Sequence, residues 1–127
     1  MLGWPAAPQG AVFRARLSPT PVDSATYAVI TGSGSVMATL SGRSLSVQGT
    51  YEGMRSTATM ARIHLGPRGV RGPAVFDLTV TKATSGSLGG TFMLTPEQVE
   101  DVRRGRFYVQ VHSEKAPEGN LWGWLLP

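Results

Sequence analysis

Cysteine is absent from this sequence of 127 residues. No disulfide can therefore hold the fold, and no thiolate can serve as a nucleophile or as a metal ligand. Charged residues make up only 16% of the chain, a fraction typical of a compact β protein and not of a disordered segment. No run of 18 apolar residues occurs, so the sequence predicts no membrane insertion.

The N-terminus carries no charged segment followed by an apolar one, so the sequence itself shows no signal peptide. The chain is therefore expected either to be cytosolic or to have lost such a segment, and the missing cysteines decide nothing, because an oxidising compartment permits disulfides without requiring them. Residues 1–11 begin "MLGWPAAPQG", which has two prolines and no hydrophobic period. We predict a leader or linker there, followed by one domain over residues 12–127.

Glycine and proline, by contrast, are frequent, at 16 and 9 residues, and they separate short runs rich in Val, Thr, Leu, Tyr and Phe. Within these runs apolar and polar residues alternate. In "VFRARL", Phe13, Ala15 and Leu17 share one face and Arg14 and Arg16 the other, as in a half-buried strand. The whole pattern predicts eight or nine antiparallel strands with Greek-key links, arranged as a β-sandwich.

One segment, "TPEQVEDVRRG", has the signals of a helix. Thr95 is a suitable N-cap, Pro96 takes the first helical position, and Gln98 completes a capping box. Arginines fill the last turn and Gly105 ends it. We predict one short connecting helix at about residues 95–104.

The two histidines of the chain lie on predicted strands, His64 in "TATMARIHL" and His112 in "RFYVQVH". Alternation places both on the face opposite the aliphatic residues. A copper or zinc site that uses them would need further ligands, and with no cysteine the candidates are Asp77, Glu114 and Glu118. Because no HxH or HExxH spacing is present, metal binding through His64 and His112 stays an alternative and no cofactor is predicted.

Catalytic motifs are missing as well. There is no GxSxG, and the glycines of "GSGSV" precede no helix that would receive a phosphate. Glu114 and Glu118 flank Lys115 in a loop and are expected to be solvated. We therefore predict that the protein is not an enzyme.

Ten arginines give the chain a formal net charge of +4. Arg62, Arg68 and Arg71 lie near His64, and a second group, at residues 103–106, ends the predicted helix, where cations complement the helix dipole. No RNA-stacking motif accompanies either group, so no nucleic-acid partner is expected. Tyr108, Trp122 and Trp124 have two interpretations: they close one edge of the core, or they anchor a protein or sugar partner.

Taken together, "ARIHLGPRGVRGPAVFDL" and "LTPEQVEDVRRGRFYVQVHSEKAPEGNLWGWL" resemble the chordin-type, or CHRD, domain family. The opening "FRARLSPTPVDSATYAVITGSGS" is similar to the start of that family, so the likeness covers residues 12–126. The resemblance implies an immunoglobulin-like sandwich that is exported, whether secreted, extracellular or periplasmic. Where the family commonly has His-x-His, this chain has Arg62 before His64, and arginine does not ligate metals.

These observations favour a non-catalytic exported module with a binding or structural role, whose partner is another protein or a cell-surface component. A metal-binding sandwich and a self-assembling domain are the alternatives. We expect His64 and His112 to lie close together on paired strands and to hold the loop of residues 66–73 by local hydrogen bonds. Further structural or binding residues are predicted to be Arg62, Gly66, Gly72, Tyr108, Trp122 and Trp124.

Overall fold

The computed structural model describes residues 10–20 and 30–127. Its elements are β1 (Ala11–Pro19), β2 (Ser33–Ser41), β3 (Ser44–Glu52), β4 (Ala58–Leu65), β5 (Ala74–Val80), β6 (Gly86–Met93), α1 (Pro96–Arg103), β7 (Phe107–Ser113) and β8 (Leu121–Trp124). The leader expected at residues 1–11 falls mostly outside the described residues, and β1 already begins at Ala11. That domain boundary stays a prediction.

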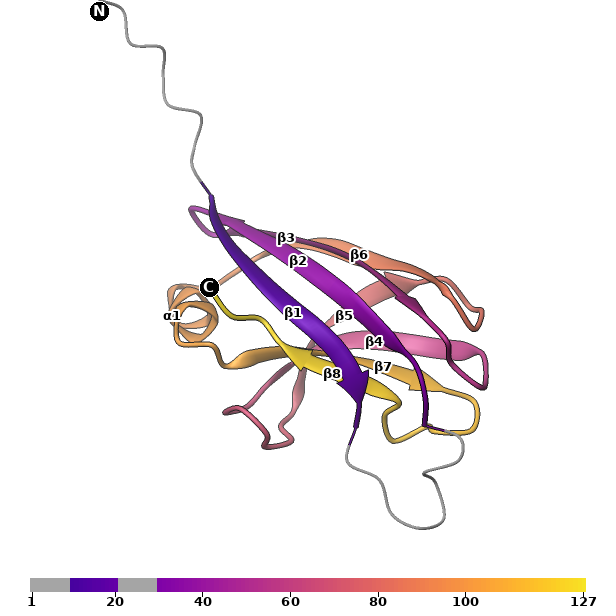
Figure 1. The fold of residues 1–127 in the computed structure, drawn as a ribbon. Coiled ribbons are helices and arrows are strands. Elements are labelled where there is room, and N and C mark those ends of the chain that lie inside the picture. The colour runs from indigo at the N-terminus through magenta and orange to yellow at the C-terminus, as the bar shows by residue number, and fades with distance from the viewer. Residues whose placement is uncertain (1–9, 21–29) are drawn as a thin grey trace, which may run out of the picture.

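All eight strands form one closed antiparallel barrel in the order β1-β2-β3-β6-β5-β4-β7-β8 (Figure 1). Strands β4, β5 and β6 follow one another, and β7 then returns to lie beside β4. This is a Greek key, and α1 lies in the returning connection. The predicted all-β class, antiparallel pairing and single short helix are confirmed.

The predicted immunoglobulin-like sandwich is wrong, because two strands join what would be separate sheets. β1 pairs with β2 along most of its length and also with β8, at Ser18 and Pro19. β5 pairs with β4 and, through Thr79 and Val80, with β6. Sandwiches and barrels both bury every second residue, so alternation alone does not distinguish them.

The barrel interior contains the apolar set that alternation predicts. In β1, Phe13, Ala15 and Leu17 are buried, whereas Arg14 and Arg16 are exposed. The same two-residue period holds in β2 and β3. Barrel closure also needs a residue without a side chain at Gly123, where a Cβ would lie 2.4 Å from the carbonyl oxygen of Arg16.

Helix α1 covers the end of the barrel at which the C-terminus also lies (Figure 1). Its capping box is formed as predicted, since the Thr95 side chain accepts from the Gln98 backbone and the Gln98 side chain accepts from the Thr95 backbone. Val102 is its buried residue. At eight residues α1 is too short to cross a lipid bilayer, and no other helix occurs in residues 10–20 and 30–127.

Strand β7 differs from the others, because every residue from Phe107 to Ser113 is buried. Phe107, Val109 and Val111 belong to the barrel core. The alternate residues point out of the barrel and would be exposed on a bare sheet. Their burial means that another part of the chain covers this outer face.

Candidate functional site

Two loops cover the outer face of β4, β7 and β8: residues 66–73, between β4 and β5, and residues 114–120, between β7 and β8. Beneath them lies a set of outward-pointing side chains that we call the outer cluster. Strand register brings its members together, since Tyr108 lies opposite both His64 and Trp124, and Gln110 lies opposite Trp122. The outer cluster consists of His64, Tyr108, Gln110, His112, Trp122 and Trp124.

Tyr108 is the centre of the outer cluster and is 1% exposed. Its ring stacks on His64 with a centroid separation of 4.9 Å and contacts Trp124 at 4.4 Å. Its hydroxyl accepts a 2.8 Å hydrogen bond from the backbone N–H of Gly72 and donates a 3.3 Å bond to the Gly72 carbonyl. Tyr108 therefore fastens the 66–73 loop onto the sheet.

Two glycines permit close backbone approaches in that loop, Gly72 against β4 and Gly66 within the loop itself. A Cβ at Gly72 would lie 1.7 Å from the carbonyl oxygen of Leu65, and one at Gly66 would lie 2.6 Å from the carbonyl oxygen of Val70. The Gly66 carbonyl accepts a 2.9 Å hydrogen bond from the indole Nε1 of Trp124. Each residue that the sequence singled out in this loop thus lies at a close backbone approach.

His64 lies under the same loop. Its Nδ1 is 2.9 Å from the carbonyl oxygen of Gly72. A carbonyl oxygen can only accept, so Nδ1 carries the hydrogen and, in the neutral ring, Nε2 carries the lone pair. This Nε2 is buried and has no hydrogen-bond partner among the described residues.

His112 is held by the other loop. Its Nδ1 lies 2.8 Å from the carbonyl oxygen of Pro117, and its Nε2 lies 3.2 Å from the side-chain nitrogen of Gln110. Burial lowers the pKa of His112, and the positive charges of Arg62 and Arg71 and the His64 ring lower it further, against the opposite effect of the Pro117 bond. At neutral pH the ring is therefore neutral, with the Nδ1–H tautomer.

The two histidines come together as the strand register allows, although each holds its own loop. Their ring centroids are 6.2 Å apart and the ring planes are inclined by 36°. His64 bonds to the 66–73 loop and His112 to the 114–120 loop. Sequence reasoning assigned both to the first loop, because it could not show that the second loop folds back over β7.

Arg62 lies opposite Gln110 on one side and Asp77 on the other. Its Nε donates to the Asp77 Oδ1 at 2.9 Å in a pair that is largely open to solvent. Glu114 and Glu118, the other proposed ligands, are exposed in their loop. In the part of the chain that the structure describes, no three His, Asp or Glu side chains gather into a possible metal site.

The contact between Arg71 and Gln110 was not predicted from the sequence. The Arg71 guanidinium donates to the Glu118 carbonyl at 3.1 Å and reaches the Gln110 side-chain oxygen at 3.5 Å. It also lies 5.3 Å from the ring centroid of Trp122, over its face. Arg71 therefore links the two covering loops to each other and to β8.

Trp122 and Trp124 are half-buried and lie outside the barrel core. They contact each other with ring centroids 4.7 Å apart. Beside them is a depression of about 260 Å³ that we call the basic groove, and none of its described lining residues is acidic. Six of these residues carry its chemistry: Arg14, Arg16, Ser18, Arg68, Trp122 and Trp124.

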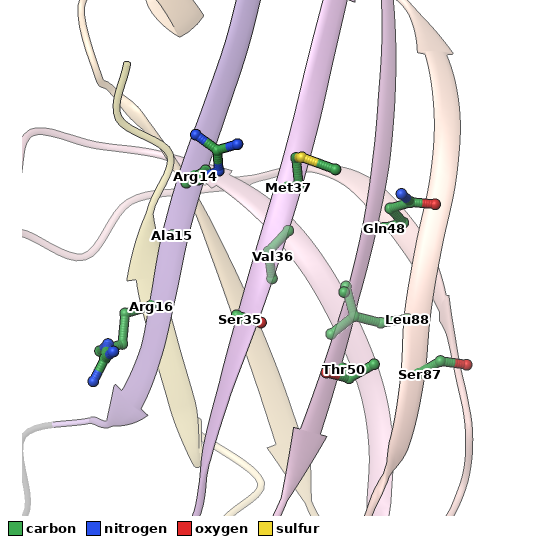
Figure 2. A pocket seen from close by; sticks show the side chains of 11 residues that line it. Arg14, Ala15, Arg16, Ser35, Val36, Met37, Gln48, Thr50, Ser87 and Leu88 are labelled. Carbon is green, nitrogen blue, oxygen red and sulfur yellow. The ribbon is translucent and has the colours of Figure 1, made fainter.

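Arg14 and Arg16 also border a broader, shallow hollow on the other side of β1, over β2, β3 and β6 (Figure 2). Its outward side chains are mixed, since Met37 and Gln48 lie there beside serine and threonine. Register aligns Arg16, Ser35 and Thr50 in one row across the strands. Arg14 and Arg16 thus lie between this hollow and the aromatic residues of β8.

Comparison with known proteins covers the strands, the two covering loops and the outer cluster together. The family model described as "CHRD domain" matches residues 13–125, which is nearly the whole described fold. No curated protein and no solved structure matches the chain significantly. The matched range contains all eight strands in whole or in part, both covering loops and the outer cluster, so the resemblance seen in the sequence is confirmed. The chain belongs to the CHRD domain family.

Proposed function

We propose that this domain is a non-catalytic module of an exported protein, and that it binds an acidic polysaccharide of a cell surface through the basic groove. Membership of the CHRD family supports the exported, non-catalytic module. The polar groups of the outer cluster support it too, because most of them are bound to backbone of the covering loops. The observation that carries the proposed ligand is the composition of the groove itself.

The positive charge of the groove is the first feature that favours an acidic ligand. Arg14, Arg16 and Arg68 line the groove, all three are exposed, and no ion pair engages them among the described residues. A guanidinium presents a planar set of donors that matches a carboxylate or a sulfate group. A ligand that carries such groups at intervals would pair with arginines that the domain itself leaves available.

The aromatic side chains of the groove are the second feature, and they favour a ligand made of sugar rings. Trp122 and Trp124 are rigid, half-exposed and edge-to-face, so they offer apolar surface at low entropic cost. Sugar rings have apolar faces that pack on indole, whereas the linear backbone of an acidic peptide offers few such faces. The combination of arginines and tryptophans therefore favours a polyanion whose repeating units are sugar rings.

Closure of the barrel favours a binding module over self-assembly. Each described strand has a neighbour on both sides, so the row of unpaired backbone groups that drives edge-to-edge association is largely removed. We therefore propose that the domain is monomeric and that its partner is a different molecule.

The test compares polysaccharides of matched size and different charge. Binding of heparin, which is sulfated, of polygalacturonate, which is carboxylated, and of neutral dextran is followed by tryptophan fluorescence. We expect binding of the two acidic polymers only. Replacing both Arg16 and Arg68 with alanine should weaken it about a hundredfold, because each lost charged hydrogen bond contributes about 1.5 kcal/mol and about 1.4 kcal/mol is a factor of ten.

The matched control replaces Arg103 and Arg106 with alanine, which removes the same charge from exposed positions at the end of α1. Affinity should change less than about twofold in that variant, since long-range charge effects are screened at physiological salt. Equal losses in both variants would contradict a specific groove. Tighter binding of a single-stranded oligonucleotide than of heparin would contradict the proposed ligand class.

A further inference from the structure

We propose that His64, His112 and Met60 form a binding site for one Cu(I) ion on the outer face of β4 and β7. The site goes beyond the proposed function, and it uses atoms that hold neither covering loop. It differs from a three-histidine centre, which this chain lacks the ligands to form.

The tautomer of each ring leaves one nitrogen free to bind a metal ion. Both Nδ1 atoms donate to backbone carbonyls, His64 to Gly72 and His112 to Pro117. Each ring therefore keeps its lone pair on Nε2. Metal-bound histidines in proteins nearly always have this arrangement, in which a carbonyl or carboxylate accepts from the other ring nitrogen and fixes the ring.

The free nitrogen of His64 is buried and lacks a hydrogen-bond partner among the described residues. His64 as a whole is 9% exposed. An unsatisfied buried polar atom costs free energy, about 1–3 kcal/mol, so native proteins contain few of them. A metal ion at this nitrogen would supply the missing partner.

The spacing of the rings fits one ion between them. A metal–nitrogen bond is about 2 Å long, so two imidazoles bound in line through one ion have centroids about 6 Å apart. The observed separation is 6.2 Å. A nearly linear pair of nitrogen ligands is a geometry that Cu(I) accepts and that Zn²⁺, which is tetrahedral in proteins, does not.

Binding at His112 displaces one hydrogen bond. The Gln110 amide, 3.2 Å from His112 Nε2, must turn away before that nitrogen can ligate. Among the described residues, the Gln110 side chain is otherwise held by the 3.5 Å contact of its oxygen with Arg71, which is at the limit of a hydrogen bond. The loss is therefore one neutral hydrogen bond, which a coordinate bond outweighs.

Met60 supplies a third donor. It lies directly opposite His112 in the β4–β7 register and points to the same face as His64. Directly opposed side chains have Cβ atoms about 5 Å apart, within reach of a flexible thioether. Thioethers select Cu(I) over harder ions. Met60 is also 38% exposed, which opens a path for the ion from solvent.

Local charge favours a monovalent ion as well. Arg62 lies on β4 between Met60 and His64, and Arg71 lies over the neighbouring Trp122. The carboxylate on the strand position opposite Arg62, that of Asp77, is paired with it. Since the repulsion between an ion and fixed charges grows with the ion's charge, these arginines disfavour Zn²⁺ and Cu²⁺ more than Cu(I).

The experiment titrates the purified domain with Cu(I), kept reduced by ascorbate under nitrogen, against the chromogenic chelator bicinchoninate. We expect one Cu(I) per chain and an X-ray absorption spectrum with two nitrogen ligands and one sulfur ligand. Met60→Leu should weaken Cu(I) binding at least about tenfold and remove the sulfur contribution. His64→Ala and His112→Ala should each abolish it.

Met93→Leu is the matched control, since Met93 is exposed on β6, away from the histidines. Its Cu(I) affinity should equal that of the unchanged protein. Because Met60 and Met93 are both exposed, neither variant is expected to unfold, and a circular dichroism melt checks this. Equal losses in both methionine variants, binding that persists without either histidine, or tighter binding of Zn²⁺ would each overturn the proposal.

Discussion

Replacing Tyr108 with alanine is expected to lower the free energy of unfolding by about 3–5 kcal/mol, the loss typical of a large aromatic side chain removed from a buried position. The effect is large for a residue outside the barrel core. Tyr108 is almost fully buried, stacks on His64 and Trp124, and holds both backbone groups of Gly72 through its hydroxyl. Chemical denaturation followed by circular dichroism measures the change.

Tyr108→Phe separates the contribution of the hydroxyl to stability from that of the ring. The ring contacts remain, but the N–H of Gly72 loses its acceptor, and we expect a loss of about 1–3 kcal/mol. Hydrogen exchange at Gly72 should accelerate in this variant while exchange in β2 and β3 stays slow. A Tyr108→Ala protein as stable as the original would show that the covered outer face contributes little to the fold.

Gly72→Ala is expected to cost at least about 2 kcal/mol, for a different reason. The new Cβ would overlap the Leu65 carbonyl oxygen, at 1.7 Å, so the 66–73 loop must move away from β4. The displaced loop takes with it the carbonyl that accepts from His64. A thermal melt should show a midpoint lower by about 8 °C or more, because 1 kcal/mol corresponds to about 4 °C in a domain of this size.

Gly69→Ala is the control for that variant, in the same loop. No atom lies within 4 Å of the Cβ it would add, although its φ of +80° imposes some strain. We expect a loss of about 1 kcal/mol from the strain alone. If Gly69→Ala cost as much as Gly72→Ala, crowding against β4 would not be the reason that position 72 needs glycine.

The sequence predicts the strands and the helix well, because alternation and capping are local signals. Thr95, Pro96 and Gln98 act in the helix start as expected. The closed barrel could not be predicted in the same way. Its closure depends on a few pairs between distant strands, such as Ser18 with Trp122, and on the close approach at Gly123, which leave no periodic trace in the sequence.

The sequence predicts on which face of the strands the residues of the candidate site lie, but not what surrounds them. Period two places His64, His112 and Tyr108 outside the barrel, and the structure places them there. What period two cannot show is that two loops bury this face, because loop conformation depends on contacts made only after the strands assemble. The basic groove combines Arg16, Arg68 and Trp122 from three separate segments, so no sequence window contains it.

The outer cluster and the basic groove share Trp122 and Trp124. Arg71, which lies over Trp122, is bound to the 114–120 loop that holds His112. The loops that shield the histidines therefore also set the shape of the groove. Strand β8, through Trp122 and Trp124, thus belongs to both of these chemically different surfaces.

Both histidine rings donate from Nδ1 to the backbone of a covering loop, and the fold of the outer face and the proposed metal site depend on this arrangement. Two-dimensional ¹H–¹⁵N NMR of the ring nitrogens, recorded at pH 8, above the ordinary histidine pKa of about 6.5, tests this directly. We predict that both rings show a protonated Nδ1 and an unprotonated Nε2. Rings protonated at Nε2, or in rapid tautomer exchange as in solvent, would contradict it.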